Sequence, residues 1–280
     1  MFLTRIVRSA RAVLLASPIC MPLFASLAPG SARAQTLQQQ ELEQTGLAQP
    51  DVKTWDIFLG GAVASTSKYE GADSNRVRPS PLFLIDYRDE LFIGPLGLQW
   101  KAIDWNGLRA GPVLGLMGGR RQDLDPRLDG LGDIPASLAA GLFVNYRFDH
   151  LQLGATFRQA VTHSSNGWLG LVQLNYRSTF ITRRLGFFVG PEVELASRKY
   201  EQTFFGVTPT QSSDSGLPIF TPPGGEKDFG FHAGLTYACT QHVIIRVFAD
   251  EKWLGSDIKD SPIVERTTET LVGIGAAYHF

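Results

Sequence analysis

Apolar and polar residues alternate along most of the chain from Trp55 to Phe280. In 151–163, for example, Leu, Leu, Ala and Phe occupy alternate positions, and Gln, Gly, Thr and Arg lie between them. Successive side chains of a β-strand point to opposite faces, so this period of two predicts strands with one apolar and one polar face. The pattern predicts an all-β fold and no helix of any size.

The alternating segments are about 11–14 residues long: 55–66, 77–87, 90–103, 107–119, 136–148, 151–163, 167–179, 185–197, 228–240, 242–254 and 267–280. Strands of soluble β-sandwiches average about five or six residues, whereas a tilted strand needs about 9–11 to cross a bilayer. Beyond the first 34 residues, no segment reaches the roughly 18 apolar residues of a spanning helix. The lengths favour a transmembrane antiparallel β-barrel.

The connections support a barrel because they alternate in length. Short ones, at 148–151, 179–185 and 240–242, alternate with long ones at 120–135, 198–227 and 255–266. Outer-membrane barrels have short periplasmic turns, longer external loops and an even number of strands. We therefore expect twelve strands, with ten as the alternative. Twelve result if 90–103 breaks near Pro95-Leu96-Gly97, or if a further strand lies near the N-terminus.

The last segment, GIGAAYHF (273–280), carries Tyr278 and Phe280 on its apolar face. A terminal aromatic strand of this kind resembles the signal that the barrel-assembly machinery of Gram-negative bacteria reads. We expect it to pair with the first strand and close the sheet, with both rings facing lipid at the periplasmic interface. Tryptophans near strand ends predict aromatic girdles; they are Trp55, Trp100, Trp168 and Trp253.

The first 34 residues have the pattern of a secretory signal peptide. Arg5, Arg8 and Arg11 precede the apolar run 12–28, and Ala32-Arg33-Ala34 forms a cleavage site. A transmembrane anchor is the alternative, disfavoured by three prolines in the segment. We expect Gln35 to begin the mature chain, 35–53 to form a flexible periplasmic arm, and 54–280 to form the barrel.

Removal of this leader changes the charge and the cysteine count. Four of the 26 basic residues lie in it, which leaves 22 against 27 acidic residues, a net charge of −5. This charge argues against a nucleic-acid partner. Cys239 would be the remaining cysteine, so a disulfide framework or a cysteine-based metal site is not expected.

Several loop motifs resemble the MltA-interacting protein (MipA)/OmpV family of outer-membrane proteins. They are YEGAD (69–73), GLGDI (130–134), FFGVTPTQSSDSGLPIFTPPGGEKD (204–228) and LGSDIKDSPIVE (254–265). Ala72, Phe204 and Val243 depart from the family's usual Ser, Tyr and Trp. The matching loop residues are Tyr69, Gly71, Asp73, Gly132, Asp133, Phe205, Gly206, Val207, Ser215, Gly216, Leu217, Pro218, Asp260, Ser261 and Pro262.

The resemblance implies a protein of the Gram-negative outer membrane, in contact with outer-membrane lipid and lipopolysaccharide. It also implies a scaffold that links a lytic murein transglycosylase to a bifunctional penicillin-binding protein. Other family members are described as porin-like, osmotically responsive or adhesive. The motif loops could therefore serve as conduit constrictions, as partner surfaces or as loop architecture.

One segment, THSSNG (162–167), suggests a hydrolase. His163 and Ser165 would share a face of an extended backbone, as in the active-site segment of outer-membrane lipid A deacylases, which this segment resembles. The orienting acid would have to be Glu192 or Glu194. We favour a tight loop with the turn at Asn166-Gly167, and a protein that is not an enzyme.

Metal and cofactor sites find little support. The acidic loop 120–133 carries Asp123, Asp125, Asp129 and Asp133, but Pro126 and Arg127 interrupt the spacing of a calcium loop. Contact with lipopolysaccharide through divalent ions suits these charges better. His232 and His242 lie on different strands without a cluster of ligands, so we expect neither a metal nor a cofactor.

The polar faces of the strands would line the lumen. Charged candidates for this lining are Arg158, Arg177, Arg246, Glu192 and Glu194. A paired network would plug the bore, whereas an unpaired set would line a small channel. The favoured function is a scaffold for murein-synthesising and murein-degrading enzymes. A narrow porin-like channel for small solutes is the alternative, and a lipid A deacylase-like hydrolase is the third.

Overall fold

The computed structural model describes residues 54–94, 97–180 and 184–280. The expected leader (1–34) and the expected periplasmic arm (35–53) lie outside this range. The strands are β1 (Trp55–Ser67), β2 (Asn75–Tyr87), β3 (Leu91–Gly94), β4 (Gly97–Trp100), β5 (Ile103–Trp105), β6 (Leu108–Met117), β7 (Ser137–Phe148), β8 (Leu151–Ala160), β9 (Trp168–Phe180), β10 (Leu185–Ala196), β11 (Gly225–Ala238), β12 (Val243–Leu254) and β13 (Thr268–His279).

The sheet closes on itself as a twelve-stranded antiparallel barrel. The first strand, β1, pairs with the last, β13, from Phe58↔His279 to Ser65↔Val272. At the other seam β4 pairs with β6 through Leu98↔Leu114 and Gln99↔Val113. The prediction of a closed barrel of twelve strands is confirmed.

Thirteen labelled strands make twelve wall positions because β4 and β5 lie in line beside β6. The β5 residue Ile103 pairs with Ala110, one residue out of register with the β4 pairs, so Lys101-Ala102 form a bulge. Gly111 of β6 lies opposite this bulge, where an added Cβ would be 1.8 Å from the Trp100 carbonyl oxygen. The absence of a side chain at Gly111 lets the bulged strand approach.

One sequence-based expectation is confirmed and another needs correction. The segment 90–103 is not one strand: β3 and β4 pair as a short hairpin, with Leu91 opposite Trp100 and Gly94 opposite Gly97. This confirms the break expected near Pro95-Leu96-Gly97. The long connection after β10 also contains helices, α2 (Arg198–Phe205) and α3 (Pro209–Ser215), where none was expected.

Capping explains these helices. Ser197 accepts a hydrogen bond from the Tyr200 N–H at the start of α2, and Thr208 and Gln211 form a capping box around Pro209 at the start of α3. Three short 3-10 turns, η1 (Gln122–Leu124), η2 (Pro126–Leu128) and η3 (Ser164–Asn166), complete the helical segments. None of the helices in the described part of the chain has the length and apolar character to span a bilayer.

The outer surface of the barrel is apolar. On β13 the outward residues Val272, Ile274 and Tyr278 are exposed, whereas Leu271 and Ala277 face inward and are buried. The same alternation holds on β12, where Ile245 and Val247 point outward. An outward apolar band is what a barrel presents to lipid. Exposed tryptophans lie at strand ends, as predicted; the most exposed, Trp105, had not been expected.

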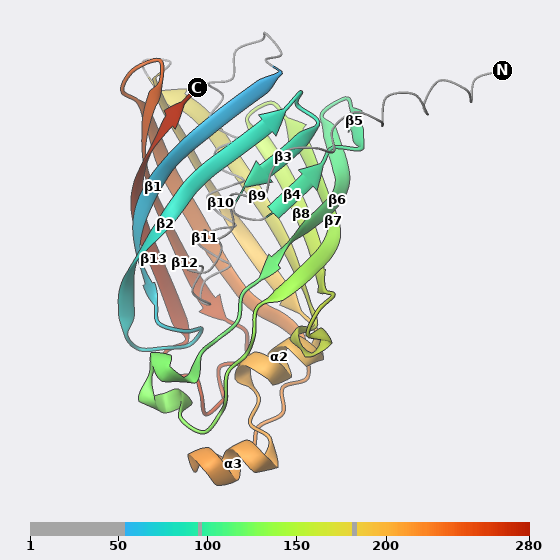
Figure 1. Ribbon diagram of the computed structural model, residues 1–280, viewed down its shortest axis with the longest axis vertical. Helices are drawn as coiled ribbons and strands as arrows, with labels where there is room; N and C mark the ends of the chain where they lie inside the picture. Colours follow the sequence, from blue (N-terminus) through green and yellow to red (C-terminus); the bar gives the residue numbers. More distant parts are fainter. Residues whose placement is uncertain (1–53, 95–96, 181–183) are drawn as a thin grey trace, which may run out of the picture.

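The two ends of the barrel differ. Short connections such as 149–150 and 239–242 lie at the end that holds the start of β1 and the C-terminus, which we call the short-turn end. The longer connections 68–74, 118–136, 197–224 and 255–267 gather at the opposite end, the loop end, together with α2 and α3 (Figure 1). This asymmetry agrees with the alternation of connection lengths in the sequence.

Candidate functional site: the loop layer and the cavity beneath it

The four long connections pack into one layer over the loop end. One cluster of buried apolar side chains receives residues from all four connections: Tyr69, Ala72, Leu128, Leu131, Val207 and Ile263, with Leu124, Leu217 and Phe220 packed against them. Loops usually lie on the surface and carry few buried contacts of their own. This shared core therefore makes the loop layer a structural unit, which covers the end of the barrel.

The first connection is fastened to the last. The Tyr69 hydroxyl lies 3.1 Å from the Ile263 carbonyl oxygen and 2.9 Å from a Glu265 carboxylate oxygen. Burial, together with the hydrogen bond to Glu265, raises the pKa of Tyr69 far above its ordinary value. The N–H of Gly71 donates to Glu269 at 2.7 Å, and its carbonyl accepts from two N–H groups of the last connection.

The third connection is held by its neighbours in the same way. Ser261 donates its hydroxyl to the Phe205 carbonyl at 2.6 Å, and Arg120 donates to the Phe204 carbonyl at 2.6 Å. A further contact joins the second connection to the last, where Arg127 donates to the Pro262 carbonyl. Burial lowers the pKa of Arg120 to about 10, so its guanidinium remains cationic at neutral pH.

The motif residues around α3 shape the backbone. Gly216 ends the helix in the left-handed region at φ 76°, and the N–H of Leu217 donates to the Ser215 hydroxyl. Gln122 contacts both Gly132 and Asp133 in the second connection. Gly206 caps α2, Val207 pairs with Phe220, and the Asp73 carbonyl accepts from Arg266. Asp133, Pro218 and Asp260 expose their side chains.

A network of charged side chains lies inside the barrel, next to the loop layer. The fully buried Lys227 ammonium lies 2.7 Å from Glu194, 2.9 Å from Asp228 and 3.1 Å from Glu70. A second group joins it through Asp228: Lys252 contacts Asp228 and Glu192, and Glu192 lies 3.2 Å from His232. Buried charges need such partners because water is not available to solvate them.

Sequence reasoning found part of this network. Arg158, Arg177, Arg246, Glu192 and Glu194 all lie on the inward face, as predicted. The same period of two places Asp228, His232 and Lys252 inward. Their neighbour Lys227 is buried as well, at the register shift opposite Glu194 and Leu195, which alternation does not predict. The pattern does not show which of these side chains meet, and none of the four was named as a lumen charge.

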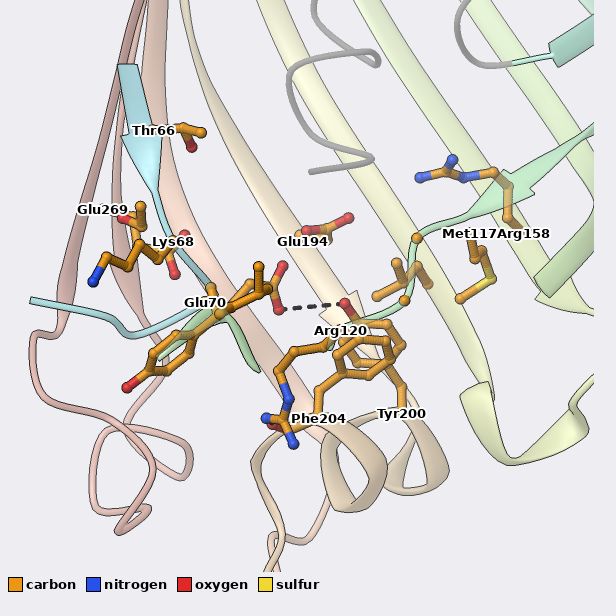
Figure 2. A pocket seen from close by; sticks show the side chains of 16 residues that line it. Thr66, Lys68, Glu70, Met117, Arg120, Arg158, Glu194, Tyr200, Phe204 and Glu269 are labelled. Carbon is orange, nitrogen blue, oxygen red and sulfur yellow. Dashed lines mark hydrogen bonds between the residues drawn. The ribbon is translucent and has the colours of Figure 1, made fainter. Parts of the chain in front are cut away.

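A cavity of about 80 Å³ lies between this network and the loop layer (Figure 2). It is lined by the end of β1 and the residues after it, the end of β6 and the residues after it, and single residues of other elements: Thr66, Ser67, Lys68, Tyr69, Glu70, Met117, Gly118, Gly119, Arg120, Leu124, Arg158, Leu169, Glu194, Tyr200, Phe204 and Glu269. Tyr200 closes one side with a hydrogen bond to Glu70 of 3.3 Å.

Comparison with protein families assigns this architecture. The family model of the MltA-interacting protein MipA matches residues 59–280, from β1 to the last residue. The chain belongs to the MipA family. The match covers the whole barrel and its loop layer, so the resemblance carried by the loop motifs is confirmed.

Solved structures of other outer-membrane proteins resemble the chain at low sequence identity. OprB of Pseudomonas putida shares 12% identity at a TM-score of 0.38, over 71% of this chain and 49% of that one. A bacterial polysaccharide outer membrane secretin shares 10% identity at a TM-score of 0.41, over 82% and 99% of the two chains, and outer-membrane expressed OmpT of Vibrio cholerae shares 8% at 0.36, over 83% and 99%. No curated protein matches the chain.

In this MipA-family barrel the predicted hydrolase residues do not form a triad. His163 and Ser165 are exposed in the β8–β9 connection, and the described hydrogen bonds do not join them. Glu192 and Glu194 are held inside the barrel by the lysine network. Asn166 is buried and donates to the Pro135 carbonyl and to Ser137, as expected for a residue that shapes a turn.

The acidic loop is used for structure. Asp125 accepts from the Lys68 ammonium at 2.9 Å and from the Arg127 N–H at 3.1 Å, and these contacts outweigh burial and lower its pKa. Asp123 pairs with Arg121, and Asp129 is exposed. Across residues 54–94, 97–180 and 184–280, the His, Cys, Asp and Glu side chains form no group of three suited to a metal ion.

The aromatic C-terminus lies at the short-turn end. The rings of Tyr278 and Phe280 meet edge to face at 4.7 Å, and both are exposed. The N–H of Phe280 donates to the Ile57 carbonyl at 3.0 Å, so pairing with β1 continues to the last residue. This placement agrees with rings that face lipid at the membrane interface.

Proposed function

We propose that this MipA-family barrel is a non-catalytic scaffold of the outer membrane that holds a murein-degrading and a murein-synthesising enzyme in the cell envelope. The family description, which names an interaction with MltA, supports a partner of this class. The geometry that carries the proposal is the loop layer: its motif residues bury one another in a shared core instead of forming an open entrance.

The proposal places the short-turn end in the periplasm, reached through export by the cleaved leader, with assembly by the barrel-assembly machinery. There the connections around β5 form a charged rim. Lys101 lies 2.6 Å from both Asp89 and Asp104, and Arg109 lies 3.3 Å from Asp89. The exposed side chains of Ile103 and Trp105 stand beside these charges. Apolar anchors next to charges are typical of protein–protein contacts.

The test is retention of murein enzymes after detergent extraction of native membranes. We expect the full-length protein to retain a lytic transglycosylase and a bifunctional penicillin-binding protein at moderate salt. Trp105→Ala and deletion of 35–53 should each reduce retention, whereas Trp253→Ala, an outward tryptophan near the loop end, should not. Absence of both enzymes from the full-length preparation contradicts the proposal.

A narrow conduit is the second candidate, because a polar, charged inner face lines the barrel. Planar bilayer recordings on the refolded protein distinguish the two. Reproducible conductance steps that change when Lys252 is replaced by Gln support a conduit. A silent bilayer, with the barrel shown to be folded, supports the scaffold.

A further inference from the structure

One part of the barrel wall is open. β3 pairs with β2 only at Ile85–Tyr87, so the outer edge of β2 from Asn75 to Leu84 has no strand beside it in the described part of the chain. Across this interval, β6 pairs with β4 no further than Leu114. The unpaired edges of β2 and β6 face each other on the loop-end side of the β3–β4 hairpin (Figure 1), and we call the unpaired stretch of wall between them the opening.

The sequence of β2 fits an unpaired edge. The N–H of Arg88 donates to Thr54, next to β1, so the N–H groups of even-numbered residues on β2 point toward β1. Those of odd-numbered residues point into the opening. Pro79 and Pro81 are odd-numbered and have no N–H, which removes two donors that would otherwise need partners within the bilayer.

The opening joins an apolar exterior to a charged interior. The outward side chains of β2 beside it include Val77, 69% exposed, and the two prolines. The alternate side chains, Arg76 and Arg78, face the lumen. Thr66, the partner of Arg76 on β1, lines the cavity, and so do the residues that end and follow β6. The cavity therefore lies directly behind the opening.

The basic and acidic side chains of the cavity lining balance: Lys68, Arg120 and Arg158 stand against Glu70, Glu194 and Glu269. What favours an anion is the difference in their partners. The acids have partners: Glu70 and Glu194 contact Lys227, and Glu269 accepts from the Gly71 N–H. Arg158 is only 4% exposed, lines the cavity and has a buried Nη1 with no hydrogen-bond partner among the described residues. In Figure 2, Arg158 and Met117 lie on one side of this space, and Thr66 and Lys68 on the other.

From this juxtaposition we propose that the opening admits an anionic lipid from the surrounding bilayer. Its phosphate group binds in the cavity at Arg158 and beside Arg76, while its acyl chains stay outside against the apolar face of β2. A guanidinium is a strong donor to phosphate oxygens, and a low-dielectric surrounding strengthens the contact. An acyl chain along β2 also covers the carbonyl edge of the opening with apolar groups.

Native mass spectrometry on the full chain in maltoside detergent tests this proposal, with dioleoylphosphatidylglycerol as the probe. Wild type should retain this lipid in preference to dioleoylphosphatidylcholine. Arg158→Gln should weaken retention by about tenfold or more, the effect of one charge-assisted hydrogen bond. Arg177→Gln, an inward arginine that contacts Gln152 farther from the loop end, should leave retention unchanged.

Three results would overturn the proposal: equal retention of the two lipids, equal retention by Arg158→Gln and wild type, or complete competition by soluble glycerol phosphate. The last result would indicate a site for a soluble anion. If Arg158→Gln does not fold, Arg158→Lys, which keeps the positive charge, replaces it and should show a smaller loss.

A second measurement does not depend on Arg158. A photo-cross-linking residue at Thr66, in the cavity, should capture dioleoylphosphatidylglycerol from bilayers. The same residue at Thr236, an inward position on β11 outside the cavity, should not. Equal capture at both positions, or none at Thr66, contradicts entry through the opening.

Discussion

At the scale of single residues, the loop layer depends on side chains that each join two connections distant in sequence. Tyr69 meets Ile263 and Glu265, and Ser261 meets the third connection at Phe205. The Tyr69 hydroxyl contributes more than the area it buries, because its loss leaves the buried Ile263 carbonyl without this donor. Tyr69 and Ser261 both belong to the family motifs, and these contacts explain why each of the two positions carries a hydroxyl group.

Tyr69→Phe should therefore lower the free energy of unfolding of the loop layer by about 1–3 kcal/mol. The ring still fills its place in the cluster, but the buried Ile263 carbonyl loses this donor, whereas the exposed Glu265 stays hydrated. Limited proteolysis of the 197–224 connection in the folded barrel measures this effect as faster cleavage. Tyr237→Phe, whose ring is 46% exposed on the outside of β11, is the control and should cleave at the wild-type rate.

Glu201 should make the loop layer sensitive to pH. Burial, with repulsion from Asp257, raises its pKa above the ordinary 4.5 in spite of the hydrogen bond from the Gly224 N–H. The folded state therefore favours the protonated carboxyl of Glu201. This contribution to stability is complete below pH 4.5 and is lost as the pH rises past the raised pKa. Glu201→Gln should stabilise the layer at pH 7.5 and have little effect at pH 4, in thermal unfolding at the two values. Equal effects at both contradict this assignment.

At the scale of elements, the strands follow from the sequence and their interruptions do not. Alternation located every long strand within a few residues, because the period of two is a local property of the backbone. The hairpin of β3 and β4 is too short for periodicity to separate, so 90–103 resembled a single strand. The two short helices depend on caps at Ser197 and Thr208, and the Thr208–Gln211 pattern was the signal that could have shown one of them.

The open edge of β2 leads to a prediction for its prolines. Pro79→Ala with Pro81→Ala adds two N–H groups to an edge without a paired strand, which should lower the free energy of unfolding in bilayers by about 1–3 kcal/mol for each buried donor. Urea unfolding followed by tryptophan fluorescence measures the change.

Two controls separate this effect from others. Pro218→Ala, in an exposed loop, measures how much stability is lost when the unfolded chain alone gains conformational freedom. Ser80→Ala lies between the two prolines and leaves the backbone donors as they were. A double proline variant that loses no more stability than Pro218→Ala would contradict an unpaired edge.

At the scale of the whole molecule, closure joins residues more than 200 positions apart. Pairing of β1 with β13 removes the sheet edges that both strands would otherwise present. The last residue takes part, since Phe280 donates to Ile57. Phe280 thus contributes to closure in addition to its expected role as part of an assembly signal.

Deletion of Phe280 should reduce the fraction of protein that folds in membranes, because it removes both an aromatic ring at the interface and the last pairing hydrogen bond. The fraction that migrates as the compact, heat-modifiable form in electrophoresis measures folding. Phe280→Tyr keeps the ring and the backbone and should fold as the wild type does. Unchanged folding after deletion would show that the terminal residue serves neither role.

The amino-acid sequence was enough to predict the kind of protein: its alternation, strand lengths and connection lengths predict a twelve-stranded barrel, and its loop motifs point to the MipA family. These features are local or lie in continuous motifs, so they can be recognised in a single sequence. The folded chain was needed to show that four loops share one core, that Lys227 and Lys252 hold the predicted lumen acids, and that the outer edge of β2 is unpaired. Such contacts depend on the register of strands far apart in the chain, and a period of two assigns a face to each residue but not a partner.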